Sequence, residues 1–161
     1  MTIIVAEPCQ AAPAADALGG DMNGPRRAQF QDKLSRYARK PDRALFLARN
    51  LDRTVGFSTV IEFLNPPRDI SSGRAETLTN LACGTGLMVL APWRSQGLGR
   101  RLAEQWEFWA LERGCGGVWC VTHRMADWYR GCLGYQRLAS TKAKGVVKTL
   151  MVKRFAPSGY P

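Results

Sequence analysis

Several residues that carry metal or disulfide chemistry are scarce in this chain of 161 residues. It has one histidine, and its five cysteines form no Cys-x-x-Cys pair, so no zinc-ligand pattern is present. The odd cysteine count favours free thiols in a reducing compartment. The apolar run at residues 3–6 is short, lacks a basic lead and ends at Glu7-Pro8, which argues against a signal peptide or membrane span. We therefore expect a cytoplasmic protein with no metal and no membrane partner.

Acidic residues are also few, 13 against 23 lysines and arginines, which gives a net charge of +10. This excess would attract a polyanionic cofactor, an acidic substrate or nucleic acid. No run of five basic residues and no recognised nucleic-acid module occurs, so nucleic acid is not favoured as a partner but stays open. The length and the apolar share of 45% predict a single domain over residues 1–161, with 156–161 as a loose tail.

The most informative segment is an apolar run that leads into a turn with two glycines and then an amphipathic stretch. It reads Val89-Leu90-Ala91-Pro92-Trp93-Arg94-Ser95-Gln96-Gly97-Leu98-Gly99-Arg100-Arg101. The N–H groups of a first helical turn are unpaired and lie at the positive end of the helix dipole, so they suit an anion. Glycines would let a phosphate approach the backbone, and the arginines add positive charge. The segment predicts a pyrophosphate site, and an ordinary strand-to-helix turn is the alternative.

Other phosphate motifs fit less well. No Gly-Lys-Ser/Thr follows the turn, which excludes a P-loop, and the absence of a third glycine makes it a poor dinucleotide fingerprint. In the helix expected at residues 97–113, Leu98, Leu102, Trp106 and Trp109 form one apolar stripe. We expect these tryptophans in the core rather than around a ligand.

The segment from Arg94 to Gly99 resembles the Arg/Gln-x-x-Gly-x-Gly/Ala acyl-CoA signature of the GNAT superfamily of acetyltransferases. The order of elements over residues 54–155 is similar to that fold. One small departure is that the usual proline falls where Ala91 stands, and Pro92 follows it. The resemblance implies a three-layer α/β (α+β) domain, in which helices cover both faces of a central mixed, mostly antiparallel sheet with splayed middle strands.

Apolar periodicity and the glycine and proline breaks predict where the elements lie. The Ala-, Pro- and Gly-rich residues 8–24 are expected to form a loop with at most one short helix. Helices are expected at residues 26–40, 97–113 and 125–133. Strands are expected at residues 2–6, 43–49, 54–64, 76–90, 118–122, 135–140 and 146–154.

The resemblance also implies where acetyl-CoA would bind. Backbone groups of Met88, Val89 and Leu90 would hydrogen-bond the pantetheine between the splayed strands, and one such N–H could polarise the thioester carbonyl. His123 falls where the family often has an asparagine that contacts pantetheine, and a merely structural histidine is the alternative. The pyrophosphate would be bound by Arg94, Ser95, Gln96, Gly97, Leu98, Gly99 and Arg100.

The catalytic acid and base are harder to assign. Many family members carry the acid as a tyrosine four residues before the Gly of a Gly-Phe/Tyr pair, but here Arg130 holds that place and Tyr129 is five before Gly134. Either the helix carries an extra residue and Tyr129 is the acid, or Arg130 replaces the tyrosine near the cofactor. Glu62 is the candidate base and Glu76 the alternative, although both suit a solvated surface equally.

The function implied by the resemblance is an acyltransferase, an acetyl-CoA-dependent N-acetyltransferase. It would move an acetyl group to a primary amine of a small molecule or protein by direct attack in a ternary complex. Two alternatives stay open: a catalytically degenerate CoA-binding regulatory module, and a nucleic-acid-directed acyltransferase or binder. A homodimer is compatible with the family. The sequence does not identify the acceptor.

Overall fold

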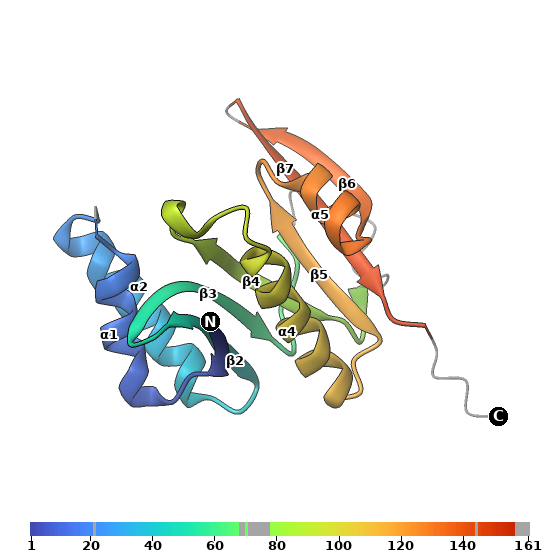
Figure 1. Ribbon diagram of the computed structural model, residues 1–161. Coiled ribbons are helices and arrows are strands. Elements are labelled where there is room, and N and C mark those ends of the chain that lie inside the picture. The colour runs from blue at the N-terminus through green and yellow to red at the C-terminus, as the bar shows by residue number, and fades with distance from the viewer. Residues whose placement is uncertain (21, 68–69, 71–77, 144, 157–161) are drawn as a thin grey trace. The chain divides into compact units, whose positions relative to one another are not determined.

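The computed structural model describes residues 1–20, 22–67, 70, 78–143 and 145–156 (Figure 1). In these residues one mixed sheet has seven strands in the order β1-β2-β3-β4-β5-β7-β6. The chain divides into two units, Met1–Ile61 with Gly86–Trp106, and Glu62–Thr85 with Glu107–Pro161. The strands are β1 Thr2–Val5, β2 Arg43–Asn50, β3 Arg53–Ile61, β4 Ala82–Val89, β5 Gly117–Thr122, β6 Gln136–Ala143 and β7 Val146–Arg154. The helices are α1 Pro8–Leu18, α2 Gly24–Arg39, the 3-10 turn η2 Ala91–Trp93, α4 Leu98–Glu112 and α5 Ala126–Leu133.

The N-terminal part of the first unit packs α1 and α2 against the antiparallel strands β1, β2 and β3. One hydrophobic core joins the small side chains of α1 to the larger side chains of the sheet. The alanines of α1 let this helix pack close to its neighbours. On α2, Leu34 is fully buried, and Phe30 packs edge-on against Phe57 of β3 with 5.3 Å between the ring centroids. The buried members of this core are Ala6, Ala11, Ala14, Ala15, Leu18, Leu34, Leu45, Leu47 and Phe57.

The structure corrects the expectation of a loop over residues 8–24, because α1 occupies most of this segment. Glu7 and Gln10 form a capping box at its start, and Pro8 stands in the first turn, where a missing N–H costs little. Pro13 lies inside the helix and removes one backbone hydrogen bond. Four side chains on one face of α1 are buried, and this burial offsets the lost hydrogen bond. The alanine, proline and glycine content of the segment alone does not predict such burial.

The rest of the first unit joins the end of β4 to the start of α4. The Ser58 hydroxyl on β3 donates to the Leu102 carbonyl of α4 at 2.9 Å, a fully buried contact. A Cβ on Gly56 would lie 2.9 Å from the Met88 carbonyl oxygen and 3.2 Å from Leu102, so only glycine fits between these segments. Trp106 is buried, as the apolar stripe predicts.

The second unit contains the start of β4 and the strands β5, β7 and β6. β5 runs parallel to β4, where residues 82–84 pair with 118–120, and antiparallel to β7. Trp109, Trp119, Tyr135 and Met151 are buried there, so the second tryptophan of the stripe is also a core residue. Lys153 of β7 forms a 2.6 Å ion pair with Glu107 of α4, which is the first α4 residue that belongs to the second unit.

Most predicted boundaries agree with the structure to within a few residues. The strand predicted over 54–64 ends at Ile61, and the one predicted over 76–90 begins at Ala82. Residues 71–77, which include the alternative base Glu76, lie outside the described residues. Within the described ranges, none of the helices is long and apolar enough to cross a membrane.

Candidate acyl-CoA site

The segment after β4 forms a loop whose backbone conformation alternates. We call residues 94–100 the phosphate loop. Arg94 has a φ of −71°, whereas Ser95 and Gly97 have positive φ values of 60° and 76°. Alternation between left-handed and ordinary conformations turns successive N–H groups toward one concavity, which is an anion-binding geometry. α4 begins immediately afterwards, and its Arg101 N–H donates to the Gly97 carbonyl at 3.1 Å.

The side chains of the phosphate loop mainly hold its own backbone in place. Arg94 Nε donates to the Val89 carbonyl at 3.0 Å, and Gln96 Nε2 donates to the Pro92 carbonyl at 3.3 Å. Arg100 forms a 2.8 Å ion pair with Glu104 one turn along α4. An anion at this loop would therefore be met first by backbone N–H groups at the helix start, with the arginines as a surrounding positive field.

At the end of β4, the backbone groups of Met88, Val89 and Leu90, the three residues predicted to bind pantetheine, point in different directions. The Leu90 N–H donates to the Val55 carbonyl of β3 at 2.9 Å, and the Met88 carbonyl faces Gly56 of β3. Because backbone groups alternate in direction along a strand, the Val89 N–H points away from β3. Of the three N–H groups, that of Val89 is therefore the one directed away from β3.

The structure distinguishes Tyr129 from Arg130 by their burial. Tyr129 is 7% exposed, and its side chain hydrogen-bonds Cys120 of β5, whereas the Arg130 side chain is 71% exposed and pairs with Asp127 at 3.5 Å. Gly134 ends α5 with a φ of 73°, and the next N–H, that of Tyr135, donates to the Tyr129 carbonyl at 3.1 Å.

Two of the buried groups in the second unit have strongly shifted acidities. Burial raises the pKa of the Cys120 thiol from 9.0 to about 12, although the hydrogen bond from Tyr129 acts in the opposite direction. Burial also raises the pKa of Tyr129 above its ordinary value, and the nearby Cys120 and Cys83 raise it further. Both side chains are therefore protonated at neutral pH. The partnership was not predicted, because the residues lie on different elements and no local spacing signals it.

The raised pKa of Cys120 predicts a specific loss of stability at alkaline pH. An unfolded thiol ionises near pH 9 while the folded one stays protonated to about pH 12, so the stabilisation is complete below pH 9 and is lost as the pH rises toward 12. We expect this thiol to contribute a loss of about 1 kcal/mol per pH unit above 9. Urea unfolding of the wild type and of Cys120→Ala at pH 8, 9.5 and 10.5 measures it. Equal pH dependence in both proteins would contradict the prediction.

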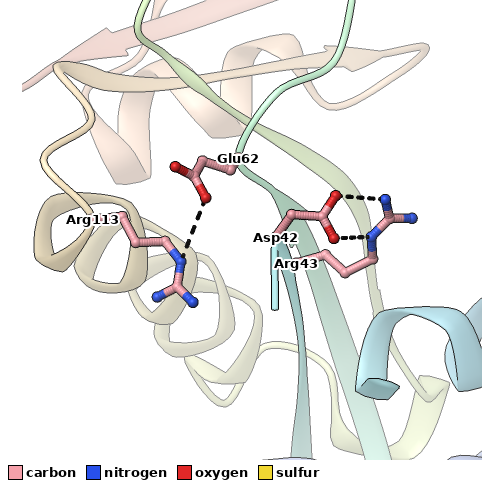
Figure 2. Close-up of polar contacts among 4 residues, drawn as sticks. All are labelled: Asp42, Arg43, Glu62 and Arg113. Carbon is pink, nitrogen blue, oxygen red and sulfur yellow. Dashed lines mark hydrogen bonds and ion pairs between the residues drawn. The ribbon is translucent and has the colours of Figure 1, made fainter. Parts of the chain in front are cut away.

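Glu62, the candidate base, lies in an ion pair with Arg113 at 3.9 Å (Figure 2). The Arg113 guanidinium lies 4.0 Å from the centre of the Trp109 ring, which fixes its position beyond the end of α4. The Glu62 side chain is 27% exposed, so it is accessible to a substrate as well as to its partner. This geometry is compatible with a base and with a purely structural ion pair.

Figure 2 also shows the bidentate pair between Asp42 and Arg43, with distances of 3.0 and 2.7 Å. The hydrogen bond from Arg43 holds the pKa of the Asp42 carboxyl below its ordinary value. The same guanidinium lies 5.4 Å from the centre of the Tyr37 ring of α2. The pair therefore ties the start of β2 to α2 and has no feature of a reactive site.

The remaining predicted site residue, His123, lies just beyond β5 and is exposed. Thr122 Oγ1 accepts a hydrogen bond from the Met125 N–H at 3.0 Å and so shapes the turn that carries the histidine. Cys9 and Cys132 are exposed, while Cys83, Cys115 and Cys120 are buried free thiols. Over the part of the chain that the structure describes, no three His, Cys, Asp or Glu residues gather as a metal site would require.

Comparisons with known proteins place this geometry in context. The family model described as acetyltransferase (GNAT) family matches residues 13–135. Comparison with curated proteins gives no significant match. The structure is similar to an aminoglycoside 6'-acetyltransferase type Ii, with 17% identity, 98% of this chain and 99% of that chain covered, and a TM-score of 0.74.

Two further solved structures have the same fold. The ribosomal-protein-S18-alanine N-acetyltransferase of Escherichia coli is 14% identical, with 99% and 98% of the two chains covered and a TM-score of 0.69. An aminoglycoside 6'-N-acetyltransferase complexed with coenzyme A is 17% identical, with 99% and 100% covered and a TM-score of 0.69. The predicted fold class, enzyme class and acetyl-CoA co-substrate are thereby confirmed, because the chain belongs to the acetyltransferase (GNAT) family.

Proposed function

We propose that this protein is an N-acetyltransferase that moves an acetyl group from acetyl-CoA to a primary amine by direct attack in a ternary complex. The observation that supports the proposal is the phosphate loop, in which Ser95 and Gly97 adopt positive φ values immediately before the start of α4. Such a loop binds the pyrophosphate of a CoA thioester through backbone N–H groups. The whole chain, residues 1–161, acts in this proposal as a single acyl-CoA N-acyltransferase domain.

Each predicted residue then has a defined task in binding the cofactor. The phosphate loop holds the pyrophosphate, and the Val89 backbone holds the pantetheine, because the Leu90 N–H and the Met88 carbonyl are directed toward β3. His123 and the exposed Arg130 supply further contacts to the cofactor. The net charge of +10 favours association with the polyanionic CoA.

The chemistry requires only a few groups. The neutral amine attacks the thioester carbonyl carbon, its nitrogen forms the amide bond, and the carbon–sulfur bond breaks. The Val89 N–H stabilises the carbonyl oxygen while it carries negative charge, and Tyr129 donates a hydrogen bond or a proton to the departing sulfur. Glu62 accepts the proton that the ammonium form of the acceptor must lose, and the second N–H proton, released as the amide forms, passes to solvent. The acceptor is a small-molecule or protein amine.

The role of Glu62 gives a separate prediction. If its carboxylate is the base, Glu62→Gln lowers kcat by about 10²-fold, because general-base catalysis contributes at least that much. If it only holds Arg113, removing the partner has the same effect, so Arg113→Met is the matched control. We expect Arg113→Met to retain kcat within about threefold, since exposed ion pairs contribute little. Equal losses in the two variants would assign Glu62 to structure.

The proposed function is tested by calorimetric titration of the purified protein with acetyl-CoA, with NADH and ATP as controls. We expect selective binding of acetyl-CoA in the micromolar range. A screen of amine acceptors, including an aminoglycoside and peptides with a free N-terminus, then follows release of the CoA thiol. Tight binding without turnover for any amine would favour a degenerate CoA-binding module, and no selective binding would overturn the proposal.

A further inference from the structure

A cavity of about 500 Å³ lies in the first unit between α1 and the end of the hairpin that β2 and β3 form. Its helical wall includes Cys9, Pro13 and Ala17, which share one face of α1 because they are spaced four residues apart. A different face of α1 is buried in the core of this unit. None of the residues that line the cavity belongs to the phosphate loop or to residues 88–90, so a ligand in it would occupy an additional site.

The hairpin supplies the charged side of this cavity. Arg49 stands near the end of β2, Arg53 begins β3, and Asp52 lies in the turn between the two strands. The pairing of β2 with β3 shifts register between Ala48 and Arg49, an irregularity of the kind that redirects a side chain. The lining therefore carries two guanidinium groups and one carboxylate, which leaves one net positive charge for a ligand to balance.

Arg49 has a donor that the protein itself does not satisfy. Its Nη2 donates to the Asp52 carbonyl at 3.1 Å, whereas its Nε is buried and has no hydrogen-bond partner among the described residues. A buried donor without an acceptor costs about 1–3 kcal/mol, so native structures seldom contain one without a reason. A carboxylate in the cavity would offer two acceptor oxygens to this guanidinium, whose planar fork matches the geometry of a carboxylate.

The remaining walls select the kind of anion. Pro13 and Leu47 provide carbon surface, and the cavity has the volume of sites that take small organic molecules. An inorganic anion would leave that carbon surface in contact with water, whereas a hydrocarbon chain would cover it. Asp52 lines the cavity, and the Glu7 carboxylate lies 3.8 Å from the Cys9 sulfur, so a second negative charge on the ligand is disfavoured.

We propose that this cavity binds a small organic monocarboxylate, with the carboxylate on Arg49 and Arg53 and the hydrocarbon body against α1. The single negative charge balances the net charge of the lining, and the carboxylate oxygens accept charge-assisted hydrogen bonds from the guanidinium groups. Binding here requires neither acetyl-CoA nor turnover, so the inference does not depend on the proposed function.

A titration of the full-length protein with hexanoate, followed by ligand-observed NMR, tests the proposal. We expect a dissociation constant on the order of 1 mM, the affinity that so small a ligand can reach. Arg49→Met should weaken binding by about tenfold or more, and Arg53→Met by about threefold because that side chain is exposed. The matched control is Arg26→Met, which removes an exposed arginine of the same unit outside the cavity and should leave the affinity unchanged.

Cys9 reports whether hexanoate occupies this cavity. Its exposed thiol is part of the lining, whereas Cys132, also exposed, lies on α5 in the second unit. Saturating hexanoate should slow alkylation of Cys9 by iodoacetamide by about threefold or more, because the ligand covers the thiol, and leave alkylation of Cys132 unchanged. Mass spectrometry of the two cysteine-containing peptides measures both rates.

The uncharged analogue hexanamide and inorganic phosphate complete the experiment. Hexanamide has the same hydrocarbon body without the charge and should bind about tenfold more weakly than hexanoate or worse. If Arg49→Met impairs folding, Arg53→Met and the Cys9 alkylation rate of the wild type still decide the question. Absence of hexanoate binding, equal protection of Cys9 and Cys132, affinity that neither arginine affects, or tighter binding of phosphate than of hexanoate would each overturn the proposal.

Discussion

Replacing Gly97 with aspartate is expected to abolish binding of acetyl-CoA. Gly97 is exposed in the phosphate loop, and no heavy atom lies within 4 Å of the position its Cβ would take, so a side chain there would enter the space that the proposed function assigns to the anion. The aspartate adds a negative charge next to a pyrophosphate. We expect affinity to fall by more than about 100-fold, since unfavourable charge pairs at a binding site cost several kcal/mol. Calorimetric titration measures the change.

Two controls separate charge from backbone strain in this experiment. Gly97→Ala keeps the strain of a positive φ without the charge and should weaken binding by only about tenfold. Gly145 has the same conformation, with a φ of 78°, and equally open surroundings in the turn after β6. Gly145→Asp should therefore lower stability by about 1 kcal/mol and leave acetyl-CoA affinity unchanged. Normal affinity in Gly97→Asp would show that the phosphate binds elsewhere.

Replacing Tyr129 with phenylalanine is expected to slow turnover while cofactor binding stays intact. Phenylalanine keeps the edge-on contacts with Trp128 and Tyr135 and removes only the hydroxyl. We expect kcat to fall by about 10²-fold with little change in the KM for acetyl-CoA, because hydrogen bonding to the leaving sulfur matters mainly in the transition state. Steady-state release of the CoA thiol at saturating amine measures both constants.

The pH dependence of kcat gives a second test of the role of Tyr129. Since burial raises its pKa above the ordinary value of 10.0, the phenol stays mainly protonated at pH 10. Wild-type kcat should therefore show no fall near pH 10 from this group. Tyr135→Phe removes the hydroxyl of the adjacent buried ring and should leave kcat within about threefold. Equal effects of the two substitutions would indicate a packing role for Tyr129.

The segment from β4 to α4 shows how far local sequence predicted the structure around the candidate site. Its apolar run predicts a strand, its two glycines predict a turn, and its apolar stripe at a 3.6-residue period predicts a helix. The structure has this strand, loop and helix in that order near the predicted residues. For residues 8–24 the sequence predicted a loop with at most one short helix, because Pro13 and the neighbouring small residues are weak local signals. The burial of the alanines against the sheet decided the extent of α1.

The sequence by itself predicted most of the order of elements, the turn between β4 and α4 and the family, because these depend on spacings of a few residues. Only the tertiary structure separates Tyr129 from Arg130 by burial. Adjacent residues on a helix point about 100° apart, so the packing of α5 on the sheet buries one side chain and leaves the other in solvent. The partnership of Tyr129 with Cys120 likewise required the fold, because contacts between a helix and a strand depend on three-dimensional packing rather than on separation along the chain.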